Sequence, residues 1–301
     1  MRHKGLVIAI IFVLLIAGAF LFGMVLFMAG GSGGVSSVMP FGGGVGIITV
    51  DGAIVSADDT VDEIDRFRKN DSVRSVVLRI ESPGGSVAAS QEILEAVRRL
   101  AGKKPVVASM GSVAASGGYY IACGAKKILA NPGTITGSIG VRMEHVMIGD
   151  LLQWAKIKHE TLKSGRLKDL ASMDRLMTAE ERQVLQGMLD DIHGQFKEEV
   201  AKARSLELKK VDEIADGRIY TGRQALELGL VDAMGGLSEA VKMAAEMGGI
   251  KGEPRLIRPK ARHLLIERLF DTAEKAISAL SSAKSLDYWQ PLMFMNTNES
   301  Y

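Results

Sequence analysis

The residue best suited to covalent chemistry is Ser116, which lies within a run of small residues, 110–118 (MGSVAASGG). Val106 and Val107 precede this run and predict a buried strand, and the Ala/Tyr/Ile-containing residues after it predict a helix. A strand, a tight turn and a helix together lift a serine hydroxyl out of the backbone near a helix N-terminus. Free N–H groups and the helix dipole favour a developing negative charge there. We therefore expect Ser116 to be a catalytic nucleophile.

A serine nucleophile needs a base, and the histidines of this chain are poorly placed for that role. His3 precedes an apolar N-terminal run, His193 falls within a long helical pattern, and His263 falls within a basic tail. We expect His193 and His263 on the surface. Position alone does not exclude His145 and His159, but neither lies in a Gly-rich or small-residue context that would indicate a pocket.

A lysine can replace histidine if burial lowers its pKa far enough to leave a neutral amine. Residues 163–169 (KSGRLKD) form a polar, turn-forming loop that contains two candidates, Lys163 and Lys168. Such a loop can hold an amine against a nucleophile, although most lysines are solvated surface residues. The residues alone leave the choice between the two lysines open.

Backbone donors for an oxyanion are predicted at residues 82–86 (SPGGS), a break that follows a predicted strand. Parallel sheets place their sites at the carboxyl ends of strands. The N–H groups of the two glycines, and that of Gly117, are therefore natural donors, although Pro-Gly-Gly alone is also an ordinary turn.

Two known serine-enzyme motifs do not fit this chain. Residues 114–118 lack the first glycine of the G-x-S-x-G elbow. The S-x-x-K motif occurs at 281–284, but it lies in the tail without its partner motifs.

Strands alternate with helices along the first half of the chain, which predicts an α/β fold with a mostly parallel sheet. Predicted strands cover 45–50, 75–80, the run before Ser116, 127–130 and, more weakly, 159–162; residues 131–141 are predicted to be a loop. Predicted helices cover 59–69, 87–100, 151–155, a long segment opened by a capping box at Thr178 and Glu181, 223–228 and 238–247. The apolar stripe of the long helix is expected to pack either in the core or in a subunit interface.

Composition excludes several classes of protein. The 301 residues carry a formal charge of +2, and Arg2 and Lys4 account for it, so the rest of the chain is neutral. The rest of the chain is neutral and 5% of the residues are aromatic, so the composition does not indicate a nucleic-acid-binding surface. The single cysteine, Cys123, excludes an internal disulfide and a CxxC metal site. No P-loop or H-E-x-x-H motif occurs, so we expect no cofactor and no metal.

The N-terminus predicts a membrane anchor. Residues 6–29 are uncharged and, as a helix at about 1.5 Å per residue, would span about 36 Å, enough to cross a bilayer. Basic residues precede this run, and the next one after it is Arg66, which predicts a cytoplasmic N-terminus and an extracytoplasmic remainder. Residues 31–44 then predict a Gly/Ser-rich tether, and residues 249–301 a basic and amphipathic tail.

Four segments together resemble the signal peptide peptidase A family in its single-domain form. They are residues 82–86, 115–120 with 136–141, 163–169, and 215–232. The resemblance covers residues 45–248, in order and at matching spacing. It implies a Clp-protease/crotonase-like spiral fold and a serine peptidase with a Ser/Lys dyad.

The resemblance also implies roles for individual residues. The nucleophile falls on Ser116 and the general base on Lys168, with Lys163 as its main competitor. Ser138 is implied to hydrogen-bond the lysine amine. The implied oxyanion donors are Gly117 and the glycine pair Gly84 and Gly85, with the choice within the pair left open.

The implied function is that of a membrane-anchored endopeptidase, assembled as a ring or dome, that degrades remnant signal peptides or other unfolded chains. The nearest alternative is an NfeD-type membrane-bound Ser/Lys peptidase that cuts a specific partner. Two further alternatives on the same fold are an inactive oligomeric scaffold and an acyl-CoA enzyme. The presence of Ser116, Lys168 and the glycines speaks against the scaffold, and the predicted anchor speaks against the acyl-CoA enzyme.

Overall fold

The computed structural model describes residues 43–259, so the predicted anchor and most of the tether and of the tail lie outside the described residues. None of the helices within this range has the length and apolarity needed to cross a membrane. The strands are β1 (Gly44–Asp51), β2 (Val73–Ser82), β3 (Val106–Ala115), β4 (Lys127–Ala130), β5 (Ile135–Gly137), β6 (Ile219–Thr221), β7 (Ala233–Met234) and β8 (Leu256–Ile257). The helices are α2 (Asp58–Lys69), α3 (Val87–Ala101), α4 (Gly117–Ala122), α5 (Gly149–Trp154), α6 (Ala179–Arg204), α7 (Leu208–Ile214), α8 (Gly222–Glu227) and α9 (Leu237–Met247).

A single sheet forms the centre of the described region, with the order β6-β5-β3-β2-β1-β8; β4 pairs with both β3 and β7. β1, β2 and β3 are mutually parallel, and their register places Val50 beside Ile80 and Ile80 beside Met110. β6 runs antiparallel to β5. The predicted α/β fold with a mostly parallel sheet is confirmed. Because parallel strands end at the same edge, the turn after β2 lies next to Ser116 after β3.

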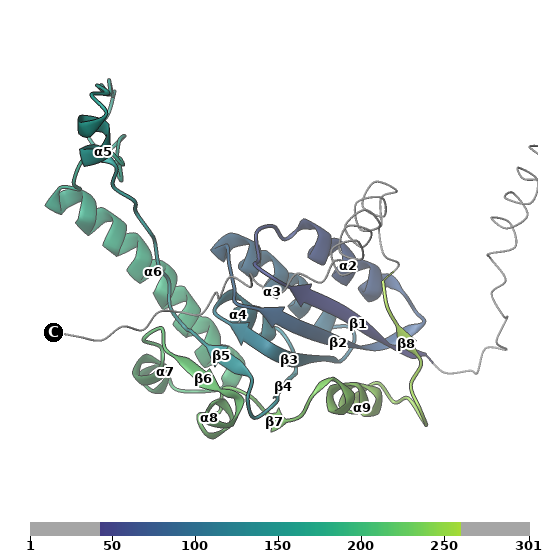
Figure 1. The fold of residues 1–301 in the computed structure, drawn as a ribbon. Coiled ribbons are helices and arrows are strands. Elements are labelled where there is room, and N and C mark those ends of the chain that lie inside the picture. The colour runs from purple at the N-terminus through teal and green to yellow at the C-terminus, as the bar shows by residue number, and fades with distance from the viewer. Residues whose placement is uncertain (1–42, 260–301) are drawn as a thin grey trace, which may run out of the picture.

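Helices cover both faces of this sheet, with α2, α3 and α4 on one face and α9 on the other (Figure 1). Strand residues alternate between the two layers: Val76 and Leu78 join the larger core, whereas Val77 and Val107 pack with the alanines of α9. Strands buried on both faces read as continuous apolar runs, which explains why β2 and β3 are clear in the sequence.

Residues 142–178, here called the arm, leave the body of the fold. Figure 1 shows α5 standing at the far end of α6 from the sheet. The N–H of Ile148 donates to the carbonyl of Met173 (2.7 Å) and ties the two sides of the arm together. The strand predicted at 159–162 is wrong, because this part of the chain has no neighbouring strand to pair with. Apolar side chains of the arm are open to solvent: Trp154 is 81% and Leu162 91% exposed.

The base of the arm is fixed by the predicted capping box of α6, which is confirmed. The Thr178 hydroxyl accepts from the N–H of Glu181 (3.2 Å), and the Glu181 carboxylate accepts from the N–H of Thr178 (2.8 Å). Arg175 donates to both Glu181 and Asp169, and its bond to Glu181 lowers the pKa of the Glu181 carboxyl to about 2. These pairs hold residues 169–181 in one arrangement.

The sheet contains short strands that local pattern did not predict. β5 lies within the predicted loop 131–141 and exists because it pairs with the end of β3 and with β6. β8 lies beyond residue 248 and pairs in parallel with β1. Two- and three-residue strands carry no periodicity of their own, so only their tertiary partners define them.

Glu63 of α2 provides a stability prediction with a definite pH dependence. Burial raises the pKa of its carboxyl to about 7, and nearby Arg66 only partly opposes this. The folded chain therefore holds this proton more tightly than the unfolded chain, so the stability contribution is full below about pH 4.5 and is lost as the pH rises through about 7. We expect Glu63→Gln to raise the free energy of unfolding by about 1–3 kcal/mol at pH 8 and to leave it unchanged near pH 4. Chemical denaturation at both pH values measures this, and an equal effect at the two values would contradict it.

Candidate active site

Ser116 lies between the end of β3 and the start of α4, in a strained backbone conformation with φ 51° and ψ −120°. Its N–H donates to the carbonyl of Gly137 (2.8 Å), and its carbonyl accepts from the N–H of Tyr120 (2.9 Å). These bonds fix the sharp strand-to-helix turn predicted around Ser116. A non-glycine residue at positive φ is uncommon, and strain of this kind clusters at functional sites.

Two backbone N–H groups beside Ser116 are free to bind an oxyanion. The N–H of Gly84 donates to the Ser82 hydroxyl (3.1 Å), so it is already committed. Within residues 43–259, the N–H groups of Gly85 and Gly117 have no partner. The two glycines lie close together, because a Cβ built on Gly117 would stand 3.3 Å from the Gly85 nitrogen. Of the two glycines left open by the sequence, the geometry favours Gly85 as donor.

The absence of a side chain at Gly84 leaves space between Ser116 and the backbone N–H groups. Its φ is +102°, a conformation that L side chains rarely adopt. A Cβ built on it would lie 2.7 Å from the Gly117 nitrogen and 2.8 Å from the Ser116 Cβ, closer than real contacts allow. Any side chain at residue 84 would therefore fill the space between the nucleophile and the donors.

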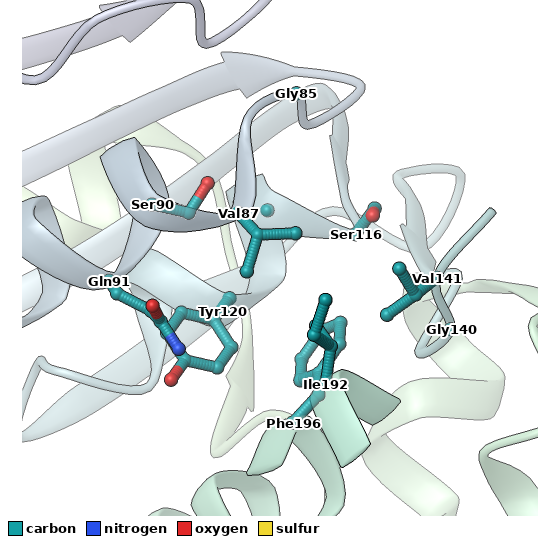
Figure 2. Close-up of a pocket in the computed structure, with 11 residues that line it drawn as sticks. Gly85, Val87, Ser90, Gln91, Ser116, Tyr120, Gly140, Val141, Ile192 and Phe196 are labelled. Atoms are coloured by element: carbon teal, nitrogen blue, oxygen red, sulfur yellow. The ribbon is translucent and has the colours of Figure 1, made fainter. Parts of the chain in front are cut away.

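An apolar cavity opens beside Ser116. Figure 2 shows Ser116, Val141 and the side chains of Tyr120, Ile192 and Phe196 around it. The rings of Tyr120 and Phe196 meet edge to face, with centroids 5.0 Å apart. Ile192 and Phe196 belong to the apolar stripe of α6, so part of that stripe forms the cavity wall. Its helical spacing looked like ordinary core packing, and no local signal marked these two residues as part of a site.

A second, more polar cavity shares Ser116 with the first. Ser138 lines it, also at positive φ (51°), and its N–H donates to the carbonyl of Arg218 (2.8 Å). Its hydroxyl has no partner among the described residues. Asp216 also lines this cavity, and its bonds to Arg218 lower the pKa of the carboxyl to about 2.

His193 is another wall residue of the second cavity, contrary to the expectation that it lies on the surface. It is half-buried, and its Nε2 is shielded from solvent with no hydrogen-bond partner in the described part of the chain. A histidine in a long amphipathic helix carries no sequence signal for this placement. The reason it faces inward is that α6 packs along the cavity.

The two candidate lysines lie on the arm, and neither lines either cavity that contains Ser116. The Lys163 amine donates to the Asp169 carboxylate (2.5 Å) and forms an ion pair with it. Lys168 is exposed, and within residues 43–259 its amine has no hydrogen bond or ion pair. Of the two, Lys168 is therefore the amine free to meet another group.

Cys123 directly follows α4 and is buried, and burial raises the pKa of its thiol to about 12, which keeps it protonated and unreactive. Within residues 43–259, no group of three histidine, cysteine or carboxylate side chains is arranged to hold a metal ion.

Two family profiles match parts of this chain. The profile of peptidase family S49 matches residues 98–251, and that of Clp protease matches residues 47–134. A putative protease of Synechocystis sp. is 48% identical over 58% of this chain and 64% of its own length. The chloroplastic serine protease SPPA of Arabidopsis thaliana is 34% identical over 68% of this chain and 30% of its own.

A putative signal peptide peptidase SppA of Enterococcus faecium is 38% identical over 60% of this chain and 52% of its own length. The chain thus aligns with less than two thirds of each of these relatives. Among solved structures, a mutant of ClpP1 from Listeria monocytogenes superposes with a TM-score of 0.45 at 15% identity, over 65% of this chain and 94% of that one. The S49 profile covers half of the chain and includes Ser116, so the chain belongs to peptidase family S49.

Proposed function

We propose that this chain is a serine endopeptidase on a Clp-protease/crotonase-like fold, in which Ser116 is the nucleophile and Lys168 the general base. The observation that carries the proposal is the placement of Ser116 beside two free backbone N–H groups, those of Gly85 and Gly117, at an apolar cavity. This combination suits acyl transfer, because it offers a nucleophile, an oxyanion site and room for a substrate side chain.

The reaction follows from these groups. The neutral Lys168 amine takes the proton of the Ser116 hydroxyl, and the oxygen attacks the carbonyl carbon of a peptide bond. The oxyanion that forms accepts hydrogen bonds from the N–H groups of Gly85 and Gly117. The C–N bond then breaks as the lysine ammonium protonates the leaving amine. Neutral Lys168 next activates a water molecule, which hydrolyses the acyl-enzyme and frees Ser116.

Lys168 has to reach Ser116 from outside the cavity, and we propose that a second copy of the chain supplies it. Lys168 lies on the arm, which extends away from the sheet that carries Ser116 (Figure 1). Apolar side chains exposed on the same arm, such as Trp154 and Leu162, favour its burial against another subunit. In this arrangement Ser138, whose hydroxyl is unpartnered within the described residues, is placed to bond the incoming amine.

We propose unfolded peptides as substrates, among them remnant signal peptides left in the membrane after secretion. The apolar cavity formed by Tyr120, Ile192 and Phe196 suits the apolar side chains that such peptides carry. The proposed location agrees with this substrate: residues 6–29 anchor the chain with its N-terminus in the cytoplasm, and residues 45–248 act outside.

The function is tested by incubating the full chain, in a mild detergent, with synthetic signal peptides, an unfolded polar protein and a tightly folded protein. We expect cleavage of the first two, cleavage on the carboxyl side of apolar residues, and no cleavage of the folded protein. The matched control is Ser116→Ala. No cleavage of any unfolded peptide would support the scaffold alternative, and cleavage confined to one protein partner would support the NfeD-type alternative.

A further inference from the structure

A basic hollow lies at the edge of the sheet opposite Ser116. Arg74 lies near the start of β2, and Lys103 and Lys104 belong to the turn between α3 and β3; all three line the hollow. Asp71 is the one acidic residue among those that line it. Three positive charges thus converge with one negative charge, at the end of the fold where the strands begin.

These charges are not neutralised by the fold. Within residues 43–259, the side chains of Arg74 and Lys103 have no hydrogen bond or ion pair. The Lys104 amine donates to the carbonyls of Phe67 (2.7 Å) and Asn70 (2.6 Å), which bond it without cancelling its charge. Burial lowers the pKa of Lys104, and the charges of Lys103 and Arg74 lower it further, while the charge of Asp71 opposes them. A bound anion would relieve this mutual repulsion.

The position of the hollow limits the source of that anion. Gly43 packs against the Arg74 side chain, so the chain enters the fold beside the hollow. Only residues 30–42 separate this point from the apolar run that we propose as the anchor, and such a segment spans at most about 50 Å when fully extended. The hollow is therefore tethered close to phospholipid headgroups.

We propose that the hollow binds the phosphate group of an anionic phospholipid and so orients the domain on the membrane. The proposal rests on the proposed membrane anchor but not on the catalytic roles. It has a structural consequence, because β3 runs from the hollow to Ser116. Its ten residues span about 33 Å at about 3.3 Å per residue. A domain docked in this way holds Ser116 well above the headgroups, so a peptide must leave the bilayer before it is cut.

The test uses the full chain in a zwitterionic detergent, titrated with short-chain phosphatidylglycerol, short-chain phosphatidylcholine or inorganic phosphate, with binding followed by calorimetry. The test variant is Arg74→Gln with Lys103→Gln, two exposed side chains, and Lys104 is left intact because it bonds the end of α2. The matched control is Arg223→Gln with Lys126→Gln, which removes the same charge from exposed positions outside the hollow.

We expect phosphatidylglycerol to bind, and the Arg74/Lys103 variant to weaken its binding by about 25-fold, or about fivefold per charge, with less than a twofold change in the control. Equal binding by the wild type and the Arg74/Lys103 variant would overturn the proposal. If inorganic phosphate binds as tightly as phosphatidylglycerol, the hollow is a site for free phosphate, and this result would also overturn the lipid proposal. Peptide hydrolysis by the Arg74/Lys103 variant should equal that of the wild type. Lipid binding and peptide hydrolysis are therefore measured independently, and one proposal can fail without the other.

Discussion

Replacing Ser116 by alanine is expected to lower the rate of peptide hydrolysis by at least about 10⁴-fold, because it removes the proposed attacking oxygen. The fold should survive, since serine and alanine differ little in their tolerance of the φ of 51° found here. The rate is measured with a fluorogenic peptide on the full chain, and assembly is checked by size-exclusion chromatography.

Ser138→Ala is the matched control for this variant, because it removes a hydroxyl from the same cavity and at the same positive φ. It should retain more activity than Ser116→Ala, since Ser138 is proposed to orient the base and not to form a bond to substrate. Near-normal hydrolysis by Ser116→Ala would disprove the nucleophile assignment.

Replacing Lys168 by alanine is the second change with a large expected effect. Without its amine, Ser116 loses its proposed general base, so activity should fall by about 10³-fold or more. Lys163→Ala is the control, because Lys163 is already paired with Asp169 and should be dispensable for the chemical step. If Lys163→Ala is inactive and Lys168→Ala is active, the general base is Lys163 and not Lys168, and the assignment of Ser116 as nucleophile is unaffected.

The turn at Ser116 and the glycines at 84 and 85 were predictable because their signals are local. A β-branched run followed by small residues predicts a strand and a tight turn wherever it occurs, and parallel pairing then brings the two turns to one edge. The choice between Gly84 and Gly85 was not predictable. It depends on a hydrogen bond from the Gly84 N–H to the Ser82 hydroxyl, and nothing in the order of residues reveals that bond.

The position of Lys168 relative to Ser116 could not be read from the sequence either. The motif around Lys168 is recognisable, but the arm that carries it has few contacts with the sheet to fix its direction. The apolar residues of the arm, Trp154 among them, look like core in the sequence and are exposed in the single chain. The same lack of local signal hides His193, Ile192 and Phe196, which face the cavities only because of how α6 packs.

The measurement that tests the account most directly is co-expression of two inactive variants, Ser116→Ala and Lys168→Ala, with different tags and purification through both tags. In such an assembly, an intact Ser116 on one copy can meet an intact Lys168 on another. If the two subunits mix at random and the base comes from a neighbouring copy, about one quarter of the sites should be complete, and about one quarter of the wild-type activity should return. Assemblies that contain both variants and show no more activity than either variant alone would contradict a site shared between copies of the chain.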